Sequence, residues 1–110
     1  MLAALALAAS LLPGALDGLG DYLQCAKASA ARLEPSGETA PVVADAALED
    51  CMGKLNGAKL AYLVVGQGHV SEEAAERSAK SAGHSAAVLM VVQMRALKVS
   101  RPVAGSRTRP

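Results

Sequence analysis

The sequence predicts an all-α protein of three to four helices: an antiparallel helical hairpin stapled by one disulfide, followed by a long C-terminal helix. At 110 residues the chain forms one domain at most. Alanine, the strongest helix former, supplies much of the 52% hydrophobic content. Phe and Trp are absent and only Tyr22 and Tyr62 are aromatic. Such a core gains little buried area per residue, so we expect a covalent support.

The N-terminal segment carries a possible export signal. Residues 2–12, LAALALAASLL, are uncharged and apolar, and a Pro-Gly-Ala break follows at residues 13–15. This pattern is typical of a secretory signal peptide with a small-residue cleavage zone, although no basic residue precedes the apolar run. The run is shorter than the roughly 20 apolar residues of a membrane-spanning helix. We expect residues 1–15 to direct export; the alternative is an apolar N-terminal helix of a cytoplasmic or membrane-associated protein.

Two helices and a turn are predicted next. Residues 19–33 place Leu and Ala at intervals of three and four residues, which is typical of one helix face. Pro35 disfavours helix at the residue before it, so the helix ends near Leu33. Thr39 is a plausible N-cap of a second helix that continues to about Leu55. Consecutive helices joined by a short turn pack as an antiparallel hairpin.

Cys25 and Cys51, the only cysteines of the chain, lie at similar heights on this hairpin. Cys25 stands eight residues before Leu33, and Cys51 stands twelve residues after Thr39. These separations correspond to about 12 Å and about 18 Å of helix, a mismatch of about one turn. A disulfide needs a Cα separation of about 6 Å, and closing it would stabilise the fold by about 3 kcal/mol. The alternative is two unlinked buried thiols in a cytoplasmic protein.

The segment from residue 25 to residue 51 also carries a resemblance. It combines C-x25-C with SGE at the turn and VADAALEDC before the second cysteine. This segment resembles a stapled helical hairpin of small exported bacterial proteins. The resemblance implies export and a hairpin, and it implies no activity.

The C-terminal half is expected to contain further helix. Residues 58–65 are rich in β-formers and could form a strand, but a lone strand would have no partner, so we favour helix. Gly66 begins a loop, and Ser71 caps a long helix that ends near Leu97. Residues 86–94 are apolar on nearly all sides, so they should be buried against the hairpin or against a partner. The predicted helical domain spans residues 16–98.

The charge distribution suggests one candidate binding site. Residues 17–50 carry seven acids and two bases, whereas residues 51–110 carry three acids and nine bases. The basic residues near the C-terminus form a candidate site for phosphates or an anionic membrane surface. They are Arg95, Lys98, Arg101, Arg107 and Arg109. The alternative is that the basic helix packs beside the acidic hairpin. We expect residues 99–110 to form a disordered basic tail.

Catalytic, cofactor and metal motifs are incomplete. The sequence LAYLVVGQGHVS imitates a strand followed by a G-x-G loop, but Ser71 stands where a dinucleotide fingerprint needs Gly or Ala. His69 and His84 do not have zinc-ligand spacing, and a site shared with Cys25 and Cys51 would compete with the disulfide. No G-x-S-x-G motif surrounds any serine. We therefore expect no catalytic residue, no cofactor and no metal, and a protein that is not an enzyme.

Two functions follow as hypotheses. The first is a small exported protein, periplasmic or secreted, with a structural or protein-interaction role in the cell envelope. Its partner would be an unknown protein or a second copy. The second is a polyanion- or membrane-surface-binding module that uses the basic C-terminal half. Nucleic acid is disfavoured as a partner because no aromatic residue lies near the bases to stack on nucleotides.

Overall fold

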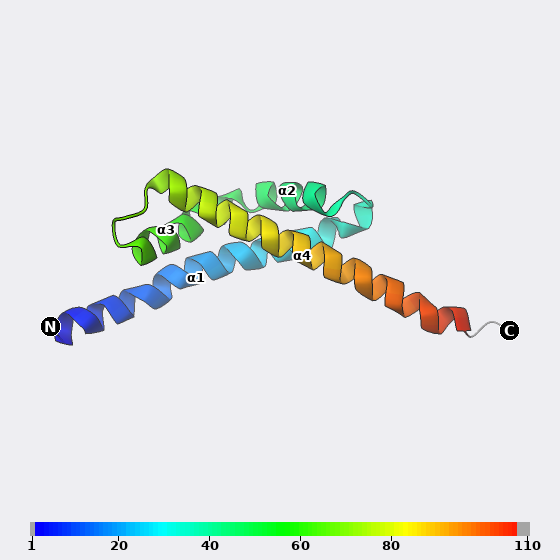
Figure 1. Cartoon of the computed structure of the whole chain (residues 1–110), viewed down its shortest axis with the longest axis horizontal. Helices are drawn as coiled ribbons and strands as arrows, with labels where there is room; N and C mark the ends of the chain where they lie inside the picture. The colour runs from blue at the N-terminus through cyan, green and yellow to red at the C-terminus, as the bar shows by residue number, and fades with distance from the viewer. Residues whose placement is uncertain (1, 108–110) are drawn as a thin grey trace.

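The computed structural model describes the backbone of residues 2–107 and the side chains of residues 14 and 16–99. The all-α prediction is confirmed: the described residues form four α-helices and two short 3-10 helices, with no strand among them (Figure 1). In chain order the elements are α1 (Leu2–Leu33), η1 (Glu34–Ser36), α2 (Ala40–Asp50), η2 (Met52–Lys54), α3 (Leu55–Gly66) and α4 (Glu72–Arg107).

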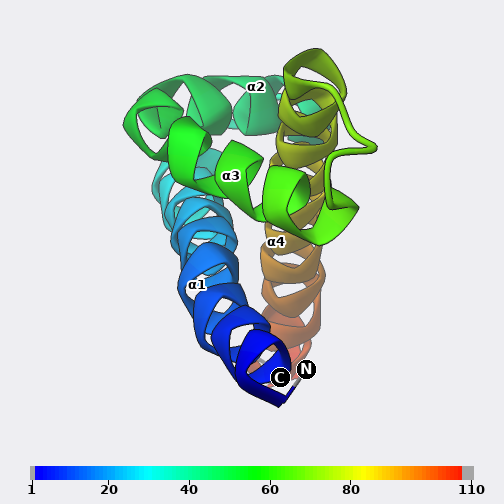
Figure 2. The same ribbon diagram turned by 90° about the vertical axis from the view of Figure 1, so that its left-hand side faces the viewer.

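The two long helices cross, and the two short helices cover one side of the crossing (Figures 1 and 2). Helices α1 and α4 each contact all three other helices, so the crossing pair forms the centre of the packing. The beginning of α1 and the end of α4 project in opposite directions beyond the crossing (Figure 1). The molecule is therefore elongated, with extents of 73 × 28 × 19 Å.

The core at the crossing is built mainly from alanine. Ala26 and Ala30 of α1, Ala44 and Ala47 of α2, and Ala87 of α4 are all fully buried. Because alanine side chains are short, the helix backbones approach closely and still exclude water. This packing explains how a chain without Phe or Trp forms an interior, although each contact buries little apolar area.

A second core cluster surrounds Tyr22, the largest fully buried side chain. Its ring lies on Gly83 of α4, where an added Cβ would stand 2.6 Å from Tyr22 Cε2. Leu55 and Ala58 of α3 complete the cluster together with Cys51 and with Ala79 of α4. The glycine in the middle of α4 thus provides the space that the only buried aromatic ring occupies.

Helices α1 and α3 meet at a pair of glycines. A Cβ added to Gly18 would lie 2.6 Å from the carbonyl oxygen of Gly57, closer than real Cβ atoms approach. The α1 and α3 backbones are therefore in direct contact at this point. Any side chain larger than hydrogen at position 18 would force the two helices apart.

Three helix boundaries differ from the sequence prediction. Helix α1 is continuous through residues 13–15, where we expected a break, because strong helix formers on both sides offset the hydrogen bond that proline removes. The second helix ends at Asp50 rather than near Leu55, and η2 separates it from α3. Helix α3 contains residues 58–65, which confirms the prediction of helix rather than strand there. Helix α4 reaches Arg107, so residues 99–107, expected to be disordered, have a helical backbone; residues 108–110 lie outside the described residues.

Candidate functional site

The hairpin carries the predicted cysteine pair. The sulfur atoms of Cys25 and Cys51 lie 2.10 Å apart, and their Cα atoms are 5.9 Å apart, which is a disulfide geometry. Cys25 projects from α1 and Cys51 directly follows the last residue of α2. The covalent link thus joins α1 to the far end of α2 and closes the hairpin opposite its turn.

Helix η1 accounts for the one-turn mismatch between the two arms of the hairpin. It continues the chain for three residues beyond α1, and Gly37 then reverses direction with a φ of 81°. At about 2 Å per residue, a 3-10 helix of this length adds roughly the missing rise to the shorter arm. The α-helix therefore ends at Leu33 as predicted, and Pro35 lies in the 3-10 helix that follows it.

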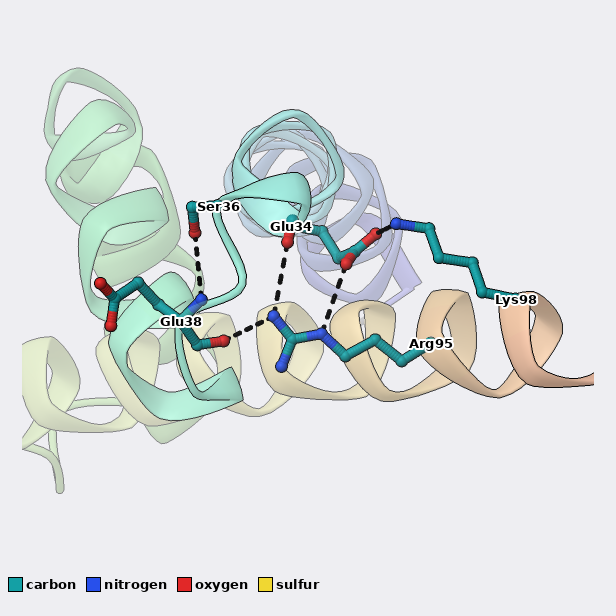
Figure 3. A network of polar contacts seen from close by, with 5 residues as sticks. All are labelled: Glu34, Ser36, Glu38, Arg95 and Lys98. Atoms are coloured by element: carbon teal, nitrogen blue, oxygen red, sulfur yellow. Dashed lines mark hydrogen bonds and ion pairs between the residues drawn. The ribbon is translucent and has the colours of Figure 1, made fainter.

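A polar network fastens the hairpin turn to α4 (Figure 3). The side chain of Glu34 is almost fully buried, and its carboxylate forms ion pairs with Arg95, at 3.3 Å, and with Lys98. Arg95 also donates hydrogen bonds to the backbone carbonyl oxygens of Glu34 and Glu38. The Arg95 guanidinium therefore donates to three acceptors: a carboxylate oxygen of Glu34 and the backbone carbonyl oxygens of Glu34 and Glu38, which lie on the two sides of the turn.

The protonation of Glu34 reflects these partners. Its hydrogen bond with Lys98 lowers the pKa of the Glu34 carboxyl, burial opposes this effect, and the hydrogen bond from Arg95 lowers the pKa further. Glu34 is thus held as a carboxylate between two cations. The network is a structural contact between hairpin and helix, as expected if the basic helix packs beside the acidic hairpin.

The side chains of two of the five candidate anion-binding residues are among the described residues, and both have a partner within the chain. Arg95 and Lys98 are both occupied by Glu34. Arg101 and Arg107 lie on α4, but their side chains are outside the described residues, as is the whole of Arg109. Two of the five cations are therefore paired within the chain itself, although the one carboxylate balances only one of their two positive charges.

The side of α4 turned away from the core carries exposed apolar residues. We define the α4 outer face by its members: Ser85, Leu89, Val92, Ala96 and Val99. The exposed fractions of Leu89, Val92 and Val99 are 54%, 51% and 73%. The opposite side of the same helix is buried through Ala87 and Val91. The structure thus buries one side of residues 86–94 against the hairpin, as predicted, and leaves the other side exposed.

An open groove runs along the edge of the α4 outer face. It has a volume of about 580 Å³ and lies between the first turn of α2 and the middle of α4. Its lining is mostly apolar and includes Pro41, Val88, Leu89 and Val92. No local pattern in the sequence points to Pro41, because only the tertiary contact of α2 with α4 brings it beside the helix.

The structure gives no support to the chemical motifs considered above. Within the described residues, no three His, Cys, Asp or Glu side chains are grouped as metal ligands. His69 is exposed in a loop, whereas His84 Nε2 lies 3.3 Å from Asp45 Oδ1. The G-x-G loop follows helix α3 rather than a strand, so the context of a dinucleotide site is missing.

One further hollow, of about 500 Å³, lies between α3 and α4. It is open and is lined by three serines, Ser78, Ser81 and Ser85, together with Arg77 and Tyr62. No His, Asp or Glu is among its lining residues, so these hydroxyls have no general base beside them. This hollow does not have the arrangement of a hydrolase site.

Comparisons with protein-family models, curated proteins and solved structures found no match for this chain. The described structure defines it as an all-α protein with a disulfide-closed hairpin and an apolar outer face on its longest helix. Among the described residues, no helix combines the length and apolar character needed to cross a membrane.

Proposed function

We propose that this chain is a non-enzymatic interaction protein of the cell envelope that presents the α4 outer face to a protein partner. The observation that carries the proposal is the exposure of Leu89, Val92 and Val99 on one side of a single helix. Contiguous exposed apolar surface on a small protein commonly marks an interaction site.

The remaining structure supports this role by keeping α4 in place. The disulfide closes the hairpin, and the ion pairs of Glu34 connect the hairpin turn to Arg95 and Lys98 on α4. A helix held in this way loses little conformational freedom when a partner binds, which favours association. The polyanion-binding alternative is less favoured, because Arg95 and Lys98 are both already paired with the carboxylate of Glu34.

Location in the envelope is supported by the cysteine pair, since disulfides persist in oxidising compartments. The test is the intact mass of the protein expressed with its own N-terminus in a bacterium with a periplasm, under non-reducing conditions. We expect a mass that lacks roughly fifteen N-terminal residues and two hydrogens. A full-length mass with two free thiols would contradict export and the disulfide together.

The interaction role is tested in the same cells with a photo-reactive amino acid at Val92. We expect ultraviolet light to produce a cross-linked species of higher mass. A matched photo-reactive residue at Leu60, on α3 and 53% exposed, should give little or none of that species. Equal yields at positions 92 and 60, or no product at either, would contradict a role for the α4 outer face.

A further inference from the structure

The α4 outer face has the residue spacing of a coiled-coil seam. Leu89, Val92, Ala96 and Val99 follow one another at intervals of three, four and three residues. An average interval of 3.5 residues keeps a seam of side chains facing a second helix along its whole length. The spacing therefore suits a helix as the occupant of this surface.

This seam is separate from the side of α4 that packs on the core. The buried residues Ala79, Gly83, Ala87 and Val91 repeat at intervals of four. At 100° per residue, Val92 and Ala96 point more than 90° away from Ala87. The chain's own helices therefore use one stripe of α4 and leave the other stripe without a partner among the described residues.

The charge of the surface suits a second copy of the same chain. Between residues 85 and 99 the only charged side chains are Arg95 and Lys98, and both bind Glu34. A two-fold interface places the same surface on both subunits, so an uncharged apolar surface is complementary to itself, whereas a charged one repels. The net charge of the chain is +1, so repulsion between whole copies is small.

The groove beside the seam provides space for side chains from such a partner. Pro41 of α2 and Val88 of α4 form its walls next to Leu89 and Val92. A partner helix on the seam would therefore contact α2 as well as α4, which increases the area it covers.

We infer that two copies of this chain associate through their α4 outer faces as a two-fold helix pair. This inference rests on the proposed interaction role and specifies its partner. Leu89, Val92, Ala96 and Val99 of each copy form the shared seam, and the groove lined by Pro41 receives side chains of the other copy.

Sedimentation of the purified full chain over a range of concentrations tests the inference. We expect a reversible dimer, and Leu89→Glu combined with Val92→Glu should weaken dimerisation at least about tenfold. Leu60→Glu is the matched control: Leu60 is 53% exposed but lies on α3, so this variant should dimerise as wild type does. Retained helical circular dichroism in the double variant would separate lost association from misfolding.

A strengthening variant makes the test independent of damage to the fold. Ala96→Leu adds apolar volume at an exposed seam position and should tighten the dimer severalfold. A wild-type chain that stays monomeric up to about 100 µM, or a dimer insensitive to substitution at Leu89, Val92 and Ala96, would overturn the inference.

The photo-cross-linked product at Val92 separates this inference from the proposed function. A product with twice the mass of the mature chain supports the second copy. A product of another mass overturns the inference and leaves the interaction role in place. The absence of any product contradicts both.

Discussion

At the scale of single residues, the stability of the interior depends on a few positions. At some of them there is no room for a larger side chain, and at one a buried hydroxyl has no hydrogen-bond partner. The hydroxyl of Tyr22 is buried and has no hydrogen-bond partner in the described structure, and burial raises its pKa. Gly18 and Gly83 lie against backbone or ring atoms that leave no space for a Cβ. The effects of substitution at these positions follow from the local packing.

Tyr22→Phe should increase the free energy of unfolding by about 1 kcal/mol, because a buried hydroxyl without a hydrogen bond carries a desolvation cost. The ring and its contact with Gly83 stay in place. Urea denaturation measures the change. Tyr62→Phe, at a half-buried position, is the control and should alter the free energy of unfolding by less than about 0.5 kcal/mol. A marked loss of stability in Tyr22→Phe would show that the hydroxyl has a favourable partner.

Gly18→Ala and Gly20→Ala should have opposite effects although the two positions share one helix. The alanine Cβ at position 18 would meet the backbone of Gly57, so we expect a loss of about 1–3 kcal/mol. Position 20 has no atom within 4 Å of an added Cβ, so alanine there should stabilise by about 0.5–1 kcal/mol. Thermal or urea unfolding of both variants measures this pair, and equal changes would contradict the α1–α3 contact.

At the scale of elements, Glu34 adds a buried polar contact to the apolar packing of α4 against the hairpin. Its carboxylate binds Arg95 and Lys98, which are 61 and 64 residues away in sequence. The contact joins the turn after α1 to the second half of α4. The contact keeps Arg95 and Lys98 beside the hairpin turn through two ion pairs. The strength of these ion pairs depends on pH, because the Glu34 carboxyl can be protonated.

Stability should decrease in acid because of Glu34. The pKa of this carboxyl is lowered in the folded state, so its contribution is present above the ordinary glutamate pKa of about 4.3. That contribution is lost as the pH falls through the lower folded-state value. Glu34→Gln should therefore lower the urea midpoint at pH 7 and have little effect below the folded-state pKa. Glu38→Gln is the control, because its side chain is exposed, and an equal change in both variants would argue against the buried ion pairs.

At the scale of the whole molecule, the fold combines small side chains with one covalent link. The core clusters contain seven alanines, two valines, a leucine and a single tyrosine, in addition to Cys51. Their short side chains permit close helix packing but bury little apolar area each. Because the net stability of small domains is only about 5–15 kcal/mol, the disulfide supplies a large share of it here.

Reduction of the disulfide should lower the free energy of unfolding by about 3 kcal/mol, since the closed loop restricts the unfolded chain. The loop joins residues 26 apart in sequence. Urea denaturation of the oxidised protein, the reduced protein and a variant with serine at both cysteines measures this difference. Coincident unfolding curves for the three forms would mean that helix packing alone sustains the fold.

The helical elements and the staple follow from local patterns in the chain. Alanine content, the three- and four-residue apolar spacing, and the turn around Pro35 and Gly37 suffice to predict the hairpin. The position of Cys25 and Cys51 relative to that turn predicts their pairing. These features depend on residues close in sequence, whose geometry the helix rise determines.

The candidate site could be predicted only in part. The spacing of Leu89, Val92, Ala96 and Val99 was visible in the chain, but residues 86–94 are apolar on several sides. Periodicity alone therefore did not show which side packs inward. The partner of two candidate cations was hidden for a related reason: Arg95 and Lys98 meet a carboxylate more than sixty residues away in sequence.

The sequence by itself determined the helices, the hairpin and the cysteine pair, because hydrogen bonding and side-chain spacing within a helix are local. Only the tertiary structure decided which side of α4 packs inward. It also brought Gly18 against Gly57 and paired Glu34 with two cations of α4. Each of these depends on contacts between helices whose relative positions arise when the whole core packs at once. The apolar face left outside by that packing is the surface on which the proposed association rests.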